Sequence, residues 1–259
     1  MKTSWNKILT LLMALVMVFS LAACGSSDRD DDDDDDEKEE KIESTWKTPI
    51  EESLGRIDAK YKMNAKNSYV NQFYGLGKSQ LETIYKIASK NDDLKENYED
   101  GIVETWENSL YEIAKVYGDD WELTHEIGDK NELDEDELDS LKADYLEECG
   151  DRLIEESDYI LDMDKDELED LADDMGLSTR DLEKLAKAFK ELGELLKDAE
   201  VKEGYEVIAE YSFSGEKGQH ESSTNYTVVE ADGIWITPKT VSASKILEPL
   251  YAIGYIDSY

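Results

Sequence analysis

Two hydrophobic periods alternate along the chain after residue 49. In the first stretch, up to residue 118, apolar residues recur every three or four positions, which is the spacing of amphipathic helices. The clearest stripe is followed by Gly118, a residue suited to a helix C-cap. It consists of Ile102, Trp106, Leu110, Ile113 and Tyr117. The pattern therefore predicts helices whose aromatic residues pack in a core.

The period then changes to two. From 121 to 127, Trp121, Leu123, His125 and Ile127 alternate with polar residues, which predicts a half-buried strand. Further strands are expected at 205–213, 222–231 and 234–237, the last two joined by Asp232-Gly233, a strong two-residue hairpin signal. The fold class predicted is α+β, with helices packed on a curved antiparallel sheet of about four strands.

A helical insertion is expected at about 134–200, because helical spacing returns there. Asp134 and Glu137 have the spacing of a capping box. The stretch 162–173 resembles a calcium loop, but Glu167 stands where that loop needs glycine, so its acids are better assigned to a helix N-terminus. Cys149 falls in an apolar stripe and is expected to be buried; the alternative, a reactive thiol, has no basic neighbour to support it.

The first 23 residues have the pattern of an export signal. Lys2 and Lys7 precede an apolar run from 8 to 23, which is short for a membrane-spanning helix. The motif "LAAC" at 21–24 resembles the lipobox of bacterial lipoproteins. The resemblance implies cleavage before Cys24, its lipidation, and a lipid anchor on the extracytoplasmic face of a bacterial cell membrane. The alternative is ordinary signal cleavage, which leaves Cys24 as an incidental thiol.

An acidic segment follows at 24–48 and contains seven consecutive aspartates, Asp30–Asp36. Like charges repel, so this segment is expected to be an extended, disordered linker; calcium binding by the aspartates is the alternative. The chain has 28 Lys and Arg against 65 Asp and Glu, a net charge of −37, which argues against a nucleic-acid partner. A globular domain is expected at 49–240, followed by a C-terminal segment at 241–259 in which Pro249 limits any helix.

One further resemblance concerns the globular part. The strand at 121–127, the strand at 205–213 and the hairpin 228–238 with its Asp-Gly-Ile-Trp resemble a group of uncharacterised bacterial lipoproteins. Their domain is similar to the nuclear transport factor 2-like, or cystatin-like, α+β cone. The resemblance implies helices on one side of a curved antiparallel sheet. Such cones host isomerases, dehydratases and binding modules, so the function has to be argued from a site.

Candidate chemistry is sparse. The chain has no Cys/His cluster with metal spacing and no Gly-rich phosphate loop, so no metal and no cofactor is predicted. The function expected is a lipid-anchored binding or interaction domain for an envelope protein or small ligand, with a cleft lined by Tyr211, Phe213, Tyr226 and Trp235.

The alternative function is an isomerase or hydratase-like enzyme that uses His125 as its acid–base group. A core histidine is the simpler interpretation of His125, and a carboxylate beside it in a cavity would favour the enzyme. His220 is expected in an exposed polar turn.

Overall fold

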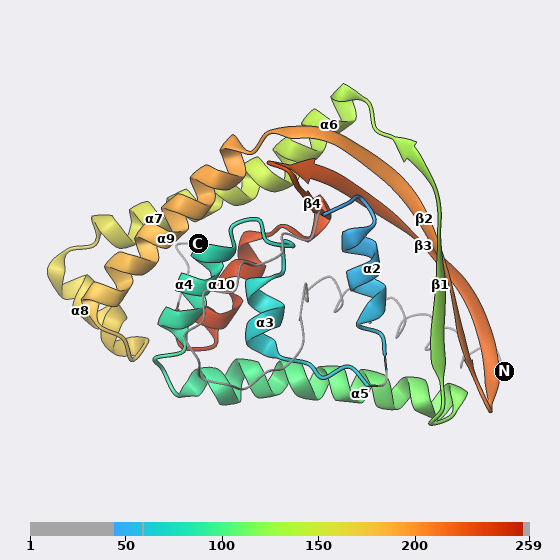
Figure 1. Cartoon of the computed structure of the whole chain (residues 1–259). Coiled ribbons are helices and arrows are strands. Elements are labelled where there is room, and N and C mark those ends of the chain that lie inside the picture. The colour runs from blue at the N-terminus through green and yellow to red at the C-terminus, as the bar shows by residue number, and fades with distance from the viewer. Residues whose placement is uncertain (1–43, 59, 256–259) are drawn as a thin grey trace, which may run out of the picture.

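The computed structural model describes residues 44–58 and 60–255. The predicted signal segment, Cys24 and the run Asp30–Asp36 lie outside these residues. Figure 1 shows the order of the elements. The helices are α2 (Thr48–Gly55), α3 (Ala65–Val70), α4 (Lys78–Ala88), α5 (Asp100–Tyr117), α6 (Glu135–Leu141), α7 (Glu148–Asp162), α8 (Lys165–Asp174), α9 (Thr179–Asp198) and α10 (Ala243–Tyr251). The strands are β1 (Glu122–Glu132), β2 (Val201–Gly215), β3 (Gly218–Ala231) and β4 (Ile234–Ile236).

The four strands form one antiparallel sheet in the order β1-β2-β3-β4. The sheet curves around α2 and does not close (Figure 1). This confirms the α+β prediction, although β2 and β3 are longer than the alternating segments that predicted them. Both residues of the Asp232-Gly233 turn have positive φ angles, 50° and 81°, as a tight two-residue hairpin requires.

The concave face of the sheet is covered by α2 and α5. The sheet core consists of their apolar side chains, those of the strands and two residues just outside these elements, Ile57 and Trp121. Its other members are Ile50, Leu54, Trp106, Ile113, Tyr117, Tyr205, Val207, Ala209, Tyr211, Phe213, Tyr226, Val228 and Trp235. A second, helical core lies among α3, α4, α7, α9 and α10. The C-terminal end of β3 contributes to both cores, because Val228 is buried in the sheet core and Val229 in the helical core.

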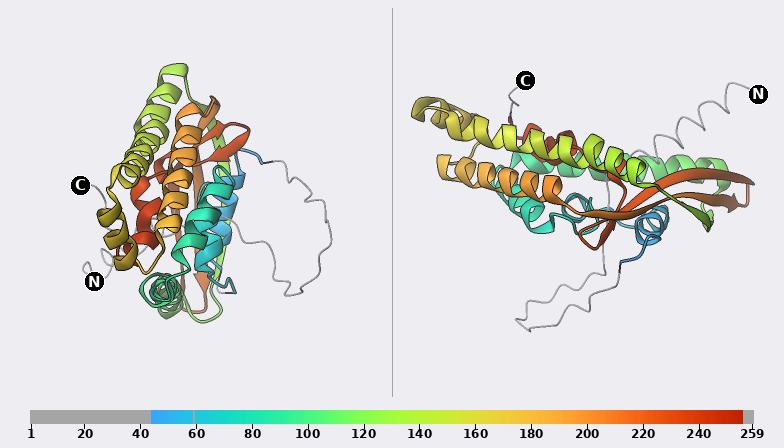
Figure 2. Two further views of the ribbon diagram at one scale, coloured as in Figure 1. Left: turned by 90° about the vertical axis from the view of Figure 1, so that its left-hand side faces the viewer. Right: turned by 90° about the horizontal axis from the view of Figure 1, so that it is seen from above.

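Helices α6, α7, α8 and α9 lie between β1 and β2 in the chain. Figure 2 shows α7 and α9 side by side, and they approach closely at two glycines. A Cβ atom on Gly193 would lie only 2.6 Å from the carbonyl oxygen of Gly150. Helix α9 ends at Asp198 and β2 begins at Val201, so the helical layer continues almost directly into the sheet.

Several local signals act as the sequence predicts. Capping boxes start α6 at Asp134, α8 at Asp164 and α9 at Ser178, which confirms helix capping for the stretch that resembles a calcium loop. Gly118 caps α5 with φ +108°.

Other features differ from the expectation. Two π-helical turns, Lys95–Glu99 and Lys142–Glu147, have no counterpart in the prediction. His220 is half-buried on β3 and not in a turn. The C-terminal segment forms α10 with Pro249 inside it. Among residues 44–58 and 60–255, no helix is long and apolar enough to cross a bilayer.

Candidate functional site

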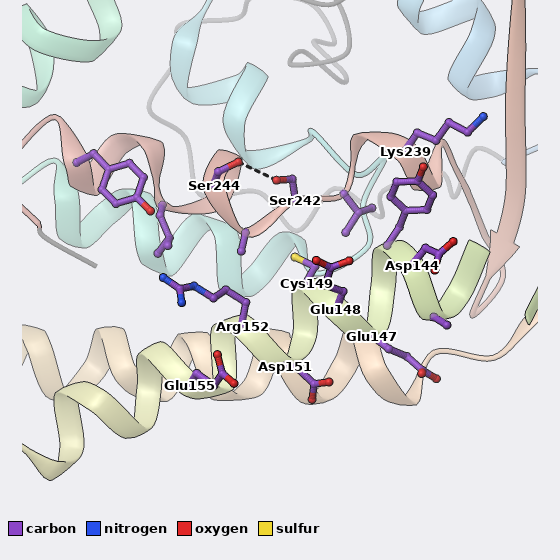
Figure 3. Close-up of a pocket in the computed structure, with 16 residues that line it drawn as sticks. Asp144, Glu147, Glu148, Cys149, Asp151, Arg152, Glu155, Lys239, Ser242 and Ser244 are labelled. Carbon is purple, nitrogen blue, oxygen red and sulfur yellow. Dashed lines mark hydrogen bonds between the residues drawn. The ribbon is translucent and has the colours of Figure 1, made fainter. Parts of the chain in front are cut away.

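A groove of about 800 Å³ separates the Lys142–Glu147 turn and α7 from the segment that leads into α10 (Figure 3). Its walls come from parts of the chain about 90 residues apart, 143–155 and 239–251. The apolar lining includes Cys149, Val241 and Leu247. The charged lining is mainly acidic and consists of Asp144, Glu147, Glu148, Asp151 and Glu155, with Arg152 and Lys239 as the cations.

Arg152, the arginine of the groove, forms an ion pair with the buried Glu156. Arg152 Nη2 lies 2.7 Å from Glu156 Oε1, and Glu156 is fully buried. The other oxygen, Glu156 Oε2, accepts a 2.6 Å hydrogen bond from the Tyr255 hydroxyl. Burial raises the pKa of Tyr255, so its hydroxyl stays protonated and acts as the donor. Much of the positive charge of Arg152 is therefore balanced beneath the groove rather than offered to a ligand.

Two carboxylates of the groove are paired with lysines outside it. Glu147 Oε1 lies 3.5 Å from Lys142 Nζ, and Asp151 forms an ion pair with Lys197. Asp144 accepts a 3.2 Å hydrogen bond from the Ser140 hydroxyl. These exposed pairs are weak, so the groove keeps an excess of negative charge over an apolar base. This arrangement suits a cationic ligand with an apolar portion.

Nothing in the groove is arranged for nucleophilic catalysis. Burial, reinforced by Glu148, raises the pKa of the Cys149 thiol to about 12, so the thiol is protonated at neutral pH. The Ser242 and Ser244 hydroxyl oxygens lie 2.8 Å apart, and among the described residues that line the groove there is no histidine to activate them. The prediction of a buried Cys149 is confirmed, since it is 4% exposed.

His125 lies elsewhere, on β1 opposite Tyr211. It is exposed, so the interpretation as a core histidine is wrong. The reason is its position: β1 is an edge strand, while α5 contacts β2 and β3. His125 borders a shallow hollow with Glu126, Glu210 and Glu221, and within the described residues no hydrogen bond joins its ring to a carboxylate.

The four aromatic residues expected to line a cleft are buried in the sheet core. Trp235 stacks on Tyr205 with ring centroids 5.5 Å apart, and Phe213 stacks on Tyr117 at the same distance. Tyr226 is covered by α2, whose Ser53 bonds to its hydroxyl, and burial raises its pKa. Tyr211 borders the hollow beside His125. These rings therefore hold α2 and α5 on the sheet and form no open cleft.

The groove has no signal in the sequence. Its acids look like the solvated face of α7, and no periodic signal brings residues 143–155 beside 239–251. Across the described ranges, no group of three or more His, Cys, Asp or Glu side chains is placed to hold a metal ion.

No protein-family model, curated protein or solved structure matches this chain. The resemblance to the nuclear transport factor 2-like cone therefore stays a prediction, and the function has to be argued from the motif and the groove.

Proposed function

We propose that the protein is a lipid-anchored binding domain on the extracytoplasmic face of a bacterial cell envelope. The observation that carries this proposal is the "LAAC" motif at 21–24, placed after a positive start and an apolar run. The acidic segment that follows gives the domain a spacer from an anionic surface. On this proposal Cys24 holds the lipid, and residues from about 49 onward do the binding.

The groove beside α7 supports the binding role. It is open and large enough for a small molecule or for a short peptide segment of a partner protein. Acidic residues predominate in its charged lining. A cationic ligand is favoured because acidic residues outnumber basic ones in the lining and because the apolar base would hold its apolar portion. The enzyme alternative gains no support from His125, which lies exposed at the sheet edge.

The anchor is tested by Cys24→Ala in a bacterial host. We expect the variant to be released from membranes or to stay unprocessed, because no thiol is left at the lipobox position to carry lipid. Cys149→Ala is the matched control and should leave membrane retention unchanged, since that thiol is buried in the helical core. Fractionation and the mass of the N-terminal peptide give the result. A Cys24→Ala protein that is still processed and membrane-bound would refute the anchor.

The groove is tested by thermal shift with spermidine, a polyamine cation. We expect spermidine to raise the melting temperature and the double variant Glu148→Gln, Glu155→Gln to reduce that shift. Glu183→Gln, which removes an exposed carboxylate from α9, is the control. Equal shifts in all three proteins would mean that the cation binds the acidic surface generally and that the groove is not its site.

A further inference from the structure

Strand β3 has one edge that is only partly paired. Its residues from Gly218 to Ala231 pair with β2, whereas β4 pairs only with Val229–Ala231. Strand β4 is short because the chain turns at Pro238 into a 3-10 helix. Within the described residues, no other backbone hydrogen bond reaches 219–227. The sheet therefore ends at β3 over most of its length.

The register shows which backbone groups face this open edge. Gly215 and Gly218 pair across a two-residue turn, which makes them a hydrogen-bonded pair. In an antiparallel ladder, hydrogen-bonded and non-hydrogen-bonded pairs alternate. The register between β2 and β3 is regular from the Gly215–Gly218 pair to the Tyr205–Val228 pair, so the alternation holds along this whole stretch. The residues whose N–H and C=O groups point away from β2 are consequently Gln219, Glu221, Ser223, Asn225 and Thr227. They continue the edge that Val229 and Ala231 present to β4.

The opposite edge of the sheet is protected, and this one is not. Strand β1 has a register shift between Ile127 and Lys130, and it bears charged residues along its length. Bulges and charges are the usual means by which proteins prevent strand addition. The open edge of β3 has no bulge over 219–227, and Glu221 is the one residue there with an acidic or basic side chain apart from His220. An unprotected edge of this length is a template for strand addition.

The convex face beside this edge sets the charge of the added strand. The pairing register places Glu122, Glu126, Glu206, Glu210 and Glu221 on the same face, and no lysine or arginine lies with them in 122–126, 206–214 or 219–227. Glu126 stands directly opposite Glu210, a like-charge pair that costs stability. An added strand would lie about 5 Å from β3, within the Debye length of about 8 Å at about 0.15 M salt, and about 10 Å from β2, close to that length.

We propose that the open edge of β3 takes an extended, basic segment of a partner protein as an additional strand. Backbone hydrogen bonds to the five outward-facing residues would hold it, and alternating lysine or arginine side chains would lie over the acidic convex face. This inference rests on the proposed role as a binding domain and does not depend on the lipid anchor or on the groove.

The probe is a blocked peptide of about nine residues that alternates threonine and lysine, which matches the span 219–227. Hydrogen exchange of the full-length protein in detergent is followed by mass spectrometry at about 0.15 M salt. We expect exchange in 219–227 to slow by at least about tenfold with saturating peptide. A peptide that alternates threonine and glutamate should give no protection.

Two controls separate strand addition from general charge attraction. The same threonine–lysine peptide with alternate amides N-methylated keeps its charge but loses backbone donors, and it should not protect the edge. In the protein, Ser223→Pro removes one outward-facing donor and should weaken peptide binding at least about tenfold, whereas Ser223→Ala should bind normally.

Three outcomes would overturn the inference. Slower exchange confined to β1 or to the groove would place the peptide elsewhere. Equal protection by the N-methylated peptide would reduce the interaction to charge. Protection of 219–227 without any peptide, in a protein that sediments as a dimer, would make a second copy of the chain the occupant. The peptide comparison uses the wild-type protein, so it decides the question even where Ser223→Pro does not fold.

Discussion

The Tyr255 hydroxyl donates a 2.6 Å hydrogen bond to the Glu156 carboxylate and so joins the end of the described chain to α7. Glu156 is fully buried, and its second oxygen lies 2.7 Å from Arg152. A buried carboxylate is tolerated only when such partners replace water. Residues 252–255, the described residues after α10, are thus part of the helical core.

Tyr255→Phe should destabilise the protein by about 1.5–3 kcal/mol, because the buried carboxylate loses a donor while the ring is kept. Urea unfolding of the two proteins measures the difference. Tyr159→Phe is the control, since Tyr159 is 42% exposed, and it should change stability by less than about 0.5 kcal/mol. Equal effects of the two substitutions on the free energy of unfolding would show that the hydrogen bond from Tyr255 to Glu156 does not stabilise the fold.

Asp181 should make stability depend on acid pH. The ion pair with Lys90 and the hydrogen bond from the Ser178 hydroxyl lower the pKa of Asp181 from 3.8 to about 2. A lowered folded-state pKa contributes stability that is present above the ordinary pKa and is lost as pH falls from about 4 to about 2. The melting temperature of wild type should therefore exceed that of Asp181→Asn at pH 6, and the gap should narrow between pH 4 and pH 2.

The control for this pH series is Asp170→Asn, which removes an exposed carboxylate from α8. Its difference from wild type should be small throughout. A gap for Asp181→Asn that stays constant down to pH 2 would rule out the carboxylate's charge as the source of the effect.

The contact between α7 and α9 should be intolerant of even one methyl group. Gly193→Ala would place a Cβ atom 2.6 Å from a backbone oxygen of α7, so we expect a loss of about 1–3 kcal/mol. Gly101→Ala, also in a helix, meets nothing within 4 Å and should stabilise the protein by about 0.5–1 kcal/mol. Thermal unfolding shows whether each substitution raises or lowers the melting temperature. A higher melting temperature for both variants would contradict the close approach of α7 and α9.

Cys149 should resist alkylation in the folded protein. Its thiol is buried, and its pKa is raised to about 12, so thiolate at neutral pH is scarce. We expect iodoacetamide to modify the peptide that contains Cys149 at least about a hundredfold faster in urea than in native buffer. Similar rates in the two conditions, read by peptide mass, would show that the groove opens to expose this side chain.

The fold could be predicted from the sequence largely because local signals agree with it. Alternation identified the strands, Asp232-Gly233 identified the last hairpin, and Asp134 with Glu137 identified a helix start. These features depend on residues close in sequence. The ends of β2 and β3 could not be predicted, because their ladder extends through polar residues near the turn that joins them.

The candidate site could not be predicted, because it depends on distant contacts. Nothing in the pattern around Glu156 indicates that Tyr255 reaches it. His125 has the alternation of a buried residue, yet it is exposed because its strand lies at the edge of the sheet. Periodicity gives the face of a strand on which a residue lies, but not how far the covering helices extend.

Val228 and Val229 are neighbours in the chain but are buried in different cores. Strand β3 cannot withdraw from the sheet core without pulling its end out of the helical core as well. The two halves of the molecule are thus mechanically coupled through a single peptide segment. Heating should melt them together in one cooperative transition, even though each half has an apolar interior of its own.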